Sequence, residues 1–330
     1  MYRPRSAVLQ RTQPQSRLGP VPSTESFNQG RLDVFTYRTH IFHNGCNQPQ
    51  RQCAAALLAG LLGSIGPSPA TAQHLSGPAN LVYAPGGELF VANFNSKTIA
   101  AFHTDGTYIG SFSTGSYGPW RIAIDNQQHL YVDSNNDVID YDTYGNQLST
   151  IRNAFGNGLA PTPNLELIAI ANNPAEIFSR NGKLRQSYTS DVQGLMFAGG
   201  SFAIANHTLY YVSGPSSGPS IAAEYQLGEF VRGNPNETTA FTNKGAYNPT
   251  QIVADAERNI YVVGYANIHG KGDDTMVKMD RHGQVLLRIS NLAFAYGVAL
   301  DPIGNIYISE QNANDIKVFN CAGTLINTIQ

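Results

Sequence analysis

Residues 296–310 read YGVALDPIGNIYISE, and this stretch decides the fold. It holds two short apolar runs, GVALD from Gly297 and IYISE from Ile306, separated by a turn that contains Pro302 and Gly304. Runs of β-branched and aromatic residues bounded by Gly, Pro and Asn are typical of short strands joined by tight turns. The stretch therefore predicts a β-hairpin.

The same pattern recurs six times over residues 73–330. The central apolar runs begin at Leu89, Leu130, Leu167, Phe202, Ile260 and Ile306. In each unit a shorter run begins eight or nine residues earlier, and an apolar residue, a Gly and a fourth run follow the central one. Self-similarity at such spacings is the signature of repeat architectures. Each unit is predicted to form four antiparallel strands, which we call a, b, c and d.

A lone sheet of this kind exposes two faces and two edges, and radial packing of six sheets buries the faces and shortens the edges. We therefore expect an all-β fold over residues 73–330, a six-bladed β-propeller of four-stranded antiparallel blades. A β-sandwich with irregular strands is the alternative. The last strand ends at Ile329, so the ring should close by side-chain packing between blades 6 and 1. An edge strand from residues 32–42 is a weaker possibility.

The low charge limits the class of partner. Residues 1–72 hold seven of the 21 basic residues and two of the 23 acidic ones, so residues 73–330 carry 14 and 21, a net charge of −7. Non-specific nucleic-acid binding depends on Lys and Arg neutralising phosphates, which this balance disfavours. Of Cys46, Cys53 and Cys321, only Cys321 lies in the propeller segment, which excludes a disulfide within it.

The N-terminal segment resembles an export signal. Residues 53–66 read CAAALLAGLLGSIG, with Arg51 before them and small residues up to Ala72 after them. A positive flank, a short apolar core and a small-residue cleavage site are typical of secretory signals. The alternative is a buried core helix. Residues 1–52 are polar and predict a disordered, atypical leader, longer than the usual ~15–30 residues of a whole signal. We therefore expect three segments: a disordered leader at 1–52, a signal-like segment with a short apolar helix at 53–72, and the propeller at 73–330. We expect the protein to be secreted or periplasmic.

Two stretches carry a family resemblance. Residues 77–93 read GPANLVYAPGGELFVAN, and with residues 296–310 they resemble NHL repeats. The resemblance covers about residues 77–329 and departs in units 3 and 4, where Pro161 and Pro163 flank a first strand and an Asp is missing before a turn. It implies a six-bladed propeller used mostly for binding, similar in architecture to lactonases, strictosidine-synthase-like proteins and amidating lyases. The motif marks the fold and says little about activity.

Loop lengths single out one face of the predicted ring. In an antiparallel blade the b–c loops and d–a links lie on one face, the looped face, and the a–b and c–d turns lie on the other, the turn face. Long insertions at 207–219, 233–249 and 265–274 all fall on the looped face. Long loops on a rigid scaffold concentrate function. The alternatives are neutral variation in loop length and a blade 4 hairpin that includes Tyr210 and Tyr211.

Polar side chains should meet where the inner strands begin on the looped face. The predicted ligand-binding set is Asn80, Trp120, Arg121, Gln193, Gln251 and Tyr296. Gly158, Gly194 and Gly297 start the other inner strands and leave room. A concave site with a few convergent polar groups is a typical ligand site, and an Arg there suits a carboxylate. Polar residues at strand starts also simply satisfy turn backbone.

Candidate residues for chemistry are few. Asn93, Asp133 and Glu310 end strand b in three contiguous blades and resemble the metal ligands of lactonase-like propellers, so calcium is a possible cofactor. The alternative, which we favour, is that they cap the b–c loops. His269, in a Gly-flanked loop, is the weak candidate for a general base. The pattern G-x-S-x-G occurs once, as GPSSG at residues 214–218, in a predicted loop of an all-β fold and not on the strand-to-helix turn of a nucleophile elbow.

These observations favour an exported, non-enzymatic and monomeric propeller. Its looped face would bind a protein, peptide or glycan ligand, without nucleic acid and without a stable membrane span after cleavage. The alternative is a secreted, metal-assisted hydrolase or lyase of the lactonase-like group, using Asn93, Asp133 and Glu310 or using His269. A domain that only packs within a larger surface assembly is a third possibility.

Overall fold

A computed structural model describes residues 73–154, 158–162, 166–170, 175–188, 201–213, 221–226, 237–242, 248–265 and 274–330. The regular secondary structure in these stretches is β-strand. The predicted leader at 1–52 and the signal-like segment at 53–72 lie outside the described residues. Within the described stretches no helix is long and apolar enough to cross a membrane.

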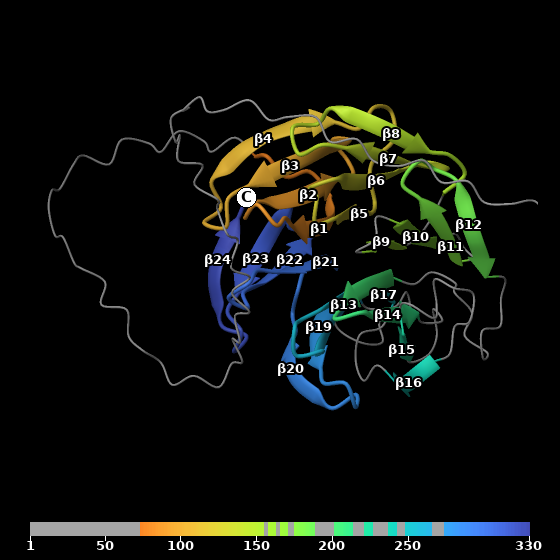
Figure 1. Ribbon diagram of the computed structural model, residues 1–330. Coiled ribbons are helices and arrows are strands. Elements are labelled where there is room, and N and C mark those ends of the chain that lie inside the picture. Colours follow the sequence, from red (N-terminus) through yellow and green to blue (C-terminus); the bar gives the residue numbers. More distant parts are fainter. Residues whose placement is uncertain are drawn as a thin grey trace, which may run out of the picture. The chain divides into compact units, whose positions relative to one another are not determined.

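The described strands build an all-β propeller of four-stranded antiparallel blades, as the sequence predicts (Figure 1). Blades 1 and 2 comprise β1 (Pro78–Tyr83), β2 (Leu89–Asn93), β3 (Thr98–Phe102), β4 (Tyr108–Ser113), β5 (Ile122–Ile124), β6 (Leu130–Ser134), β7 (Asp137–Tyr141) and β8 (Gln147–Ile151). Blades 3 and 4 comprise β9 (Gly158–Pro161), β10 (Glu166–Ile170), β11 (Ala175–Ser179), β12 (Leu184–Tyr188), β13 (Ser201–Ala205), β14 (Thr208–Ser213), β15 (Ile221–Gln226) and β16 (Glu237–Thr242). Blades 5 and 6 comprise β17 (Pro249–Ala254), β18 (Ile260–Gly264), β19 (Thr275–Met279), β20 (Val285–Ile289), β21 (Ala295–Leu300), β22 (Ile306–Glu310), β23 (Asp315–Phe319) and β24 (Leu325–Ile329).

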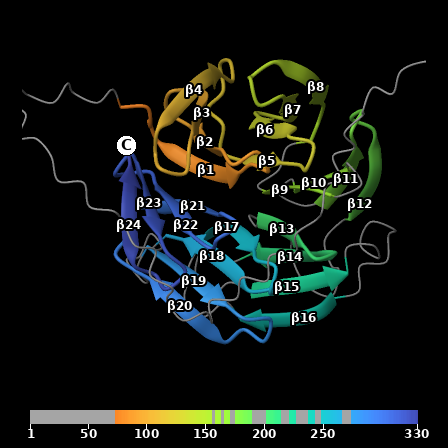
Figure 2. The same cartoon turned by 60° about the vertical axis from the view of Figure 1, so that its left-hand side comes forward.

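The first strand of each blade is the innermost. These strands contact one another in a closed order, β1, β5, β9, β13, β17, β21 and back to β1, and Figure 2 shows them facing a common centre. All five residues of β2 are buried, whereas β4 alternates between half-buried and exposed positions. A strand covered on both faces reads as a continuous apolar run. This is why the second strands are the clearest repeat in the sequence.

Blades 1 and 6 close the ring through side chains. Each of the two sheets takes its four strands from one continuous stretch of chain. Leu81 and Phe102 of blade 1 share a buried apolar cluster with Tyr307 and Ile329 of blade 6, and Leu75 joins this cluster from outside the sheets. The closure by packing that the sequence predicts is therefore what the structure shows.

An Asp–Tyr pair stabilises the turn between the first two strands in blades 2, 5 and 6. In each pair the tyrosine hydroxyl donates to the second carboxylate oxygen of an aspartate six residues earlier, at 3.1 Å; the pairs are Asp125–Tyr131, Asp255–Tyr261 and Asp301–Tyr307. The first oxygen accepts a backbone N–H four residues on, at 2.8–2.9 Å. The carboxylate accepts hydrogen bonds from turn backbone and from a tyrosine hydroxyl, so the role of this Asp is structural.

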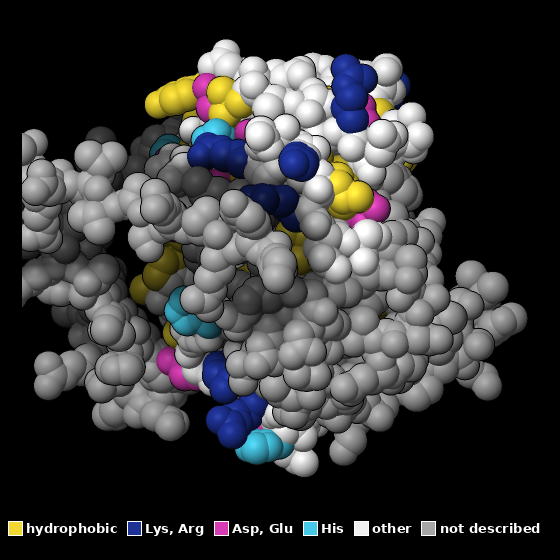
Figure 3. Space-filling view, turned by 45° about the vertical axis from the view of Figure 1, so that its right-hand side comes forward, with side chains coloured by type: hydrophobic (Ala, Val, Ile, Leu, Met, Phe, Trp, Pro, Cys, Tyr) yellow, Lys and Arg dark blue, Asp and Glu magenta, His cyan; other side chains and the backbone are white. Residues whose placement is uncertain are grey.

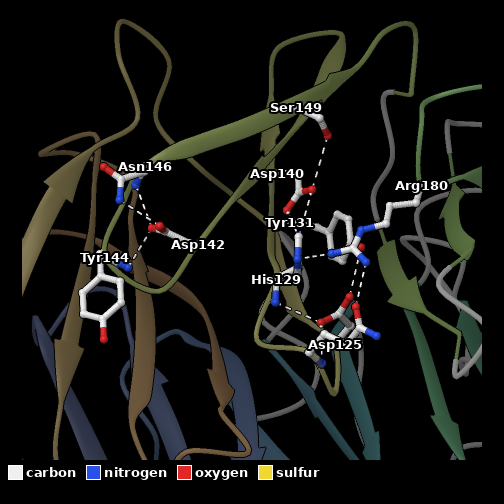
Figure 4. A network of polar contacts seen from close by, with 10 residues as sticks. Asp125, His129, Tyr131, Asp140, Asp142, Tyr144, Asn146, Ser149 and Arg180 are labelled. Carbon is white, nitrogen blue, oxygen red and sulfur yellow. Dashed lines mark hydrogen bonds and ion pairs between the residues drawn. The ribbon is translucent and has the colours of Figure 1, made fainter. Parts of the chain in front are cut away.

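Blade 2 departs from this pattern at one position. Blades 5 and 6 have Asn259 and Asn305 four residues after the aspartate, and each donates its side-chain amide to the carboxylate at 2.8 Å. Blade 2 has His129 there, and its Nδ1 atom lies 2.8 Å from the buried Asp140 (Figure 4). Its Nε2 atom contacts Arg180 of blade 3. The histidine thereby joins two neighbouring blades.

The strand assignment predicted for blade 4 is wrong. The run from Phe202, expected as the second strand, is the innermost strand β13, and it pairs with β14 from Ser201↔Val212 to Ala205↔Thr208. Asn206 and His207 join them with φ of 48° and 59°. Positive φ at both central residues is the geometry of a two-residue hairpin turn. The equivalent turns of the other blades are longer. Because blade 4 has the shorter turn, the sequence pattern placed its innermost strand in the position of the second strand.

This correction changes the loop argument. The predicted insertion 207–219 contains β14, so the hairpin alternative with Tyr210 and Tyr211 is the correct one. His207 lies in a first turn, on the turn face and not the looped face. The predicted link 233–249 contains β16. Most of the third insertion, residues 266–273, lies outside the described residues, as does the run predicted from Gly194.

Candidate functional site

Polar side chains at the start of the inner strands join neighbouring blades. The Asn80 Oδ1 atom in blade 1 accepts the N–H of Ile122 in blade 2 at 3.2 Å. The Ser201 hydroxyl in blade 4 accepts the N–H of Ile252 in blade 5 at 3.4 Å. Each acceptor stands at the same level of its blade and reaches the next inner strand. We call Asn80, Ser201 and Gln251 the polar belt.

Gln251 makes two such contacts. Its Oε1 atom accepts the N–H of Val298 in blade 6 at 2.8 Å, and its Nε2 atom donates to the carbonyl of Leu81 in blade 1 at 3.2 Å. The residue is 7% exposed. Its amide thus connects blade 5 to blades 6 and 1, the two blades that meet at the closure of the ring. Asn80 and Gln251, predicted as ligand groups, have side chains that hydrogen-bond the backbone of other blades.

Five aromatic rings gather on the looped face beside the belt. Trp120 lies 3.9 Å from Phe94 and 5.2 Å from Tyr296, measured between ring centroids. Tyr265 lies 4.7 Å from Phe294 and stacks on Tyr296 at 6.3 Å with an interplanar angle of 10°. All five residues are half-buried. Four of them lie in loops of blades 1, 2, 5 and 6, and Tyr296 lies at the start of β21. We call the five residues the aromatic shelf.

Backbone contacts hold the shelf in place. Gly118 packs so closely on Phe94 that an added Cβ atom would lie 2.2 Å from the Phe94 carbonyl oxygen. The N–H of Phe294 donates to Asp274 at 2.6 Å, and the Asn248 side chain donates to the carbonyl of Tyr265 at 3.4 Å. The loops that carry these rings are therefore tied to one another next to the ends of strands, which favours a preformed surface.

Arg121 supplies the positive charge of the shelf. Its guanidinium carbon lies 5.0 Å from the centroid of the Tyr296 ring, and its Nη1 atom donates to the Trp120 carbonyl at 3.1 Å. Such a cation over an aromatic face is attracted by the ring quadrupole. Arg121 is 8% exposed, so the charge lies under the rings. Trp120, Arg121 and Tyr296 of the predicted set are thus brought together.

Asp133 fixes the position of Trp120 and Arg121. Its Oδ1 atom accepts the N–H of Trp120 at 2.8 Å and that of Arg121 at 2.7 Å. Burial raises the pKa of Asp133 to about 6, although the Arg121 N–H and charge, followed by the Trp120 N–H, act to lower it. The carboxylate is therefore a positioning group whose charge changes in mildly acidic solution.

The other two predicted metal ligands are also bonded to loop backbone. Asn93 donates to the His74 carbonyl at 3.0 Å and accepts the N–H of Ser76 at 3.2 Å. The Glu310 Oε1 atom accepts the N–H of Ala293 at 2.8 Å. Across the described stretches, no group of three or more His, Cys, Asp or Glu side chains is arranged to hold a metal ion.

Two of the site residues predicted from the sequence cannot be placed, and three residues of the shelf were not predicted. Gln193 and His269 lie outside the described residues. Phe94, Tyr265 and Phe294 belong to the shelf and were not predicted from the sequence. Their position in the sequence could have indicated two of them. Phe94 and Tyr265 directly follow the second strands β2 and β18, and therefore lie on the same face as Trp120 and Tyr296.

The described charged side chains on one side of the molecule form no continuous patch of one sign. On the side shown in Figure 3, Lys and Arg side chains form separate patches, and Asp and Glu side chains lie between them. Long-range attraction of a ligand needs a continuous field of one sign.

Solved structures with a similar fold include a hydrazine synthase and two lyases. Hydrazine synthase from Kuenenia stuttgartiensis matches with a TM-score of 0.57 and 15% identity, covering 81% of this chain and 90% of that one. Virginiamycin B lyase from Staphylococcus aureus matches with 0.53 and 12%, covering 76% and 83%. A streptogramin B lyase matches with 0.53 and 13%, covering 79% and 85%. The fold is a β-propeller.

The comparisons go no further than the fold. No family model matches the chain, and no curated protein sequence matches it. At 12–15% identity, the likeness to solved structures carries neither activity nor ligand.

Proposed function

We propose that the chain is an exported, six-bladed, NHL-like propeller that binds a protein, peptide or glycan ligand on its looped face. The observation that carries this proposal is the aromatic shelf around Arg121. Half-buried aromatic rings offer flat apolar faces to sugar or side-chain rings, and such residues dominate binding energetics at interfaces. The guanidinium beneath them suits a ligand that carries a carboxylate.

The proposed mechanism is recognition without a chemical step. Trp120 and Tyr296 contact the ring or apolar part of the ligand, and Arg121 attracts its anionic group through the partly desolvated mouth. Asp133 keeps the Trp120–Arg121 backbone in place through two N–H···O bonds. Because these loops are bonded to one another, little ordering is needed on binding, which favours affinity.

Array screening tests this function. Residues 73–330 are applied to peptide and glycan arrays, and each hit is repeated with Arg121→Glu and with Trp120→Ala. Tyr144→Ala is the matched control, because Tyr144 is 87% exposed in the c–d turn of blade 2 on the turn face. We expect hits to disappear in both shelf variants and to persist in the control. Unchanged hits in folded shelf variants would count against the site.

A metal-assisted hydrolase or lyase is the second candidate. It is favoured by two buried carboxyl groups on the looped face, Asp133 and Glu310, whose pKa values burial raises. Perturbed carboxyl groups gather at catalytic sites. Thermal unfolding with calcium, with zinc and with chelator separates the candidates. A metal-specific rise in Tm with lactone hydrolysis would favour the enzyme, and unchanged melting without turnover would favour the binding protein.

Export is a separate part of the proposal. It rests on the apolar core 53–66 and the small residues that end at Ala72. Mass spectrometry of the protein from the culture medium or periplasm identifies its first residue. We expect Gln73, and a protein that retains residues 1–72 in the cell would contradict export.

A further inference from the structure

Residues 74–77 cross the junction between blades 6 and 1, and we call them the N-terminal strap. Leu75 is 1% exposed and packs in the apolar cluster that joins the two blades. The N–H of Gly77 donates to the side chain of Asn314, in the β22–β23 loop of blade 6, at 2.6 Å. Strand β1 begins directly after the strap, at Pro78. The chain thus enters blade 1 through contacts with blade 6.

The strap is bonded to the loop that carries Phe94 of the aromatic shelf. The N–H of Phe94 donates to the Gly77 carbonyl at 3.0 Å, and the N–H of Asn95 donates to the Ser76 carbonyl at 3.2 Å. The Phe94 ring in turn lies 3.9 Å from the Trp120 ring, measured between centroids. The strap therefore fixes the backbone under one end of the shelf.

The link between β20 and β21, residues 290–294, makes the same pair of contacts in blade 6. The N–H of Gln311 donates to the Phe294 carbonyl at 3.1 Å. The N–H of Asn312 donates to the Ala293 carbonyl at 3.3 Å. A strand precedes this link and a strand follows it, so both of its ends are fixed. The strap is fixed by β1 at one end only, since no strand precedes it in the described part of the chain.

Non-covalent contacts hold the N-terminal end of the strap. The His74 ring stacks on Tyr108 of β4, with ring centroids 3.6 Å apart and an interplanar angle of 7°. Asn93 accepts the N–H of Ser76 at 3.2 Å and donates to the carbonyl of His74 at 3.0 Å. Chain termini are ordered where such contacts tie them down, and they open at a lower free energy than the whole fold. The strap can therefore leave its place while the blades stay folded.

We propose that the N-terminal strap is a detachable support that controls the shelf. With the strap in place, Phe94 and Trp120 keep the arrangement that a ligand meets, and its release removes the support. The site of N-terminal processing then decides whether the shelf is complete, because cleavage after Ala72 keeps the strap and cleavage after Leu75 removes its apolar anchor. The role in ligand binding rests on the function proposed above, whereas the hold of the strap on Phe94 does not.

Amide hydrogen exchange of residues 73–330 tests whether the strap detaches, because exchange reports local opening. We expect the N–H groups of Phe94 and Asn95 to exchange faster than those of Gln311 and Asn312. The two pairs make the same bonds, and only the second pair is bonded to a link that is fixed at both ends. Equal exchange of the two pairs would contradict a detachable strap.

Trp120 is the only tryptophan of the chain, so its fluorescence reports the state of the shelf. Residues 78–330 lack the strap, and Asn314→Gly removes its bond to blade 6 at a φ of 54°, which glycine adopts freely. In both proteins we expect emission at longer wavelength and stronger quenching by acrylamide. Asn135→Gly is the matched control, because Asn135 is exposed at a φ of 60° in the equivalent loop of blade 2. If residues 78–330 fail to fold, unchanged emission of folded Asn314→Gly would still overturn the proposal.

Peptide and glycan arrays separate this inference from the proposed function. They are probed with residues 73–330, with Asn314→Gly and with Asn135→Gly. We expect the hits of the wild type to weaken about tenfold or more in Asn314→Gly and to persist in the control. Hits of equal strength in all three proteins would overturn the control of the shelf by the strap. If the wild type has no hits, the proposed function fails, and exchange and fluorescence still decide the strap.

Discussion

The Oε1 atom of Gln251 accepts the N–H of Val298 at 2.8 Å, so one buried amide links the inner strands of blades 5 and 6. The Nε2 atom of the same amide reaches the Leu81 carbonyl of blade 1. Asn80 and Ser201 make equivalent contacts to the next blade along the chain. The centre of the ring is therefore held by side-chain amides and a hydroxyl as well as by apolar packing.

Gln251→Leu should destabilise the fold by about 2–4 kcal/mol, because it leaves one buried N–H and one buried carbonyl without their partner. Urea unfolding of residues 73–330 measures the change. Gln147→Leu is the matched control, since the Gln147 amide bonds Thr150 on the exposed strand β8. We expect the control to change the free energy of unfolding by less than about 0.5 kcal/mol. Equal effects of the two substitutions would show that the belt is not structural.

Gly297→Ala should weaken the closure between blades 6 and 1. A Cβ atom at Gly297 would lie 2.5 Å from a Leu81 methyl group and 2.7 Å from the Ala79 carbonyl oxygen, so the two inner strands would have to separate. Overpacking of this kind costs about 1–3 kcal/mol. Gly110→Ala is the control, because nothing lies within 4 Å of its added Cβ atom. A Gly297→Ala variant as stable as Gly110→Ala would be at odds with closure by close packing.

Asp133 should make the protein more stable in mild acid than at neutral pH. Its pKa is about 6 in the folded protein and about 3.9 in an unfolded chain. Between these pH values the folded state holds a proton that the unfolded state has lost. The contribution to stability is therefore complete below pH ~4 and falls by up to about 3 kcal/mol as the pH rises through ~6.

Asp133→Asn isolates this contribution, because the amide keeps the oxygen acceptor and cannot titrate. Subtracting the variant's free energy of unfolding from that of the wild type at each pH removes the effect of all other groups. We expect this difference to decrease between pH 4 and pH 6.5. Parallel curves over that range would mean that the folded pKa of Asp133 is ordinary.

Most of the fold follows from the sequence, and the exception has a local cause. The repeated Asp–x₅–Tyr spacing and the buried second strands, such as Leu89–Asn93, fix the register of a blade. Blade 4 lacks that turn and uses Asn206 and His207 at positive φ. A sequence pattern that assumes the longer turn therefore assigns Phe202 to the second strand, although it lies in the innermost one.

The candidate site was less predictable. The sequence brings Asn80, Arg121 and Gln251 to one level, yet it does not say which side chain meets the backbone of another blade. Asn80 and Gln251 do so, whereas Arg121 packs on Tyr296 from blade 6. These partners come from different repeats and depend on the rotation between blades, which local pattern does not encode.

The most direct test of the proposed function is calorimetric titration of an array-selected ligand into wild type, Tyr296→Ala and Tyr144→Ala. Tyr296 contacts Trp120, Tyr265 and the Arg121 guanidinium, so its removal opens the centre of the shelf. The account predicts an affinity loss of about 10- to 30-fold for Tyr296→Ala, the effect of about 1.4–2 kcal/mol expected for a central aromatic contact. It predicts no change for Tyr144→Ala. Equal affinities for all three proteins would contradict it.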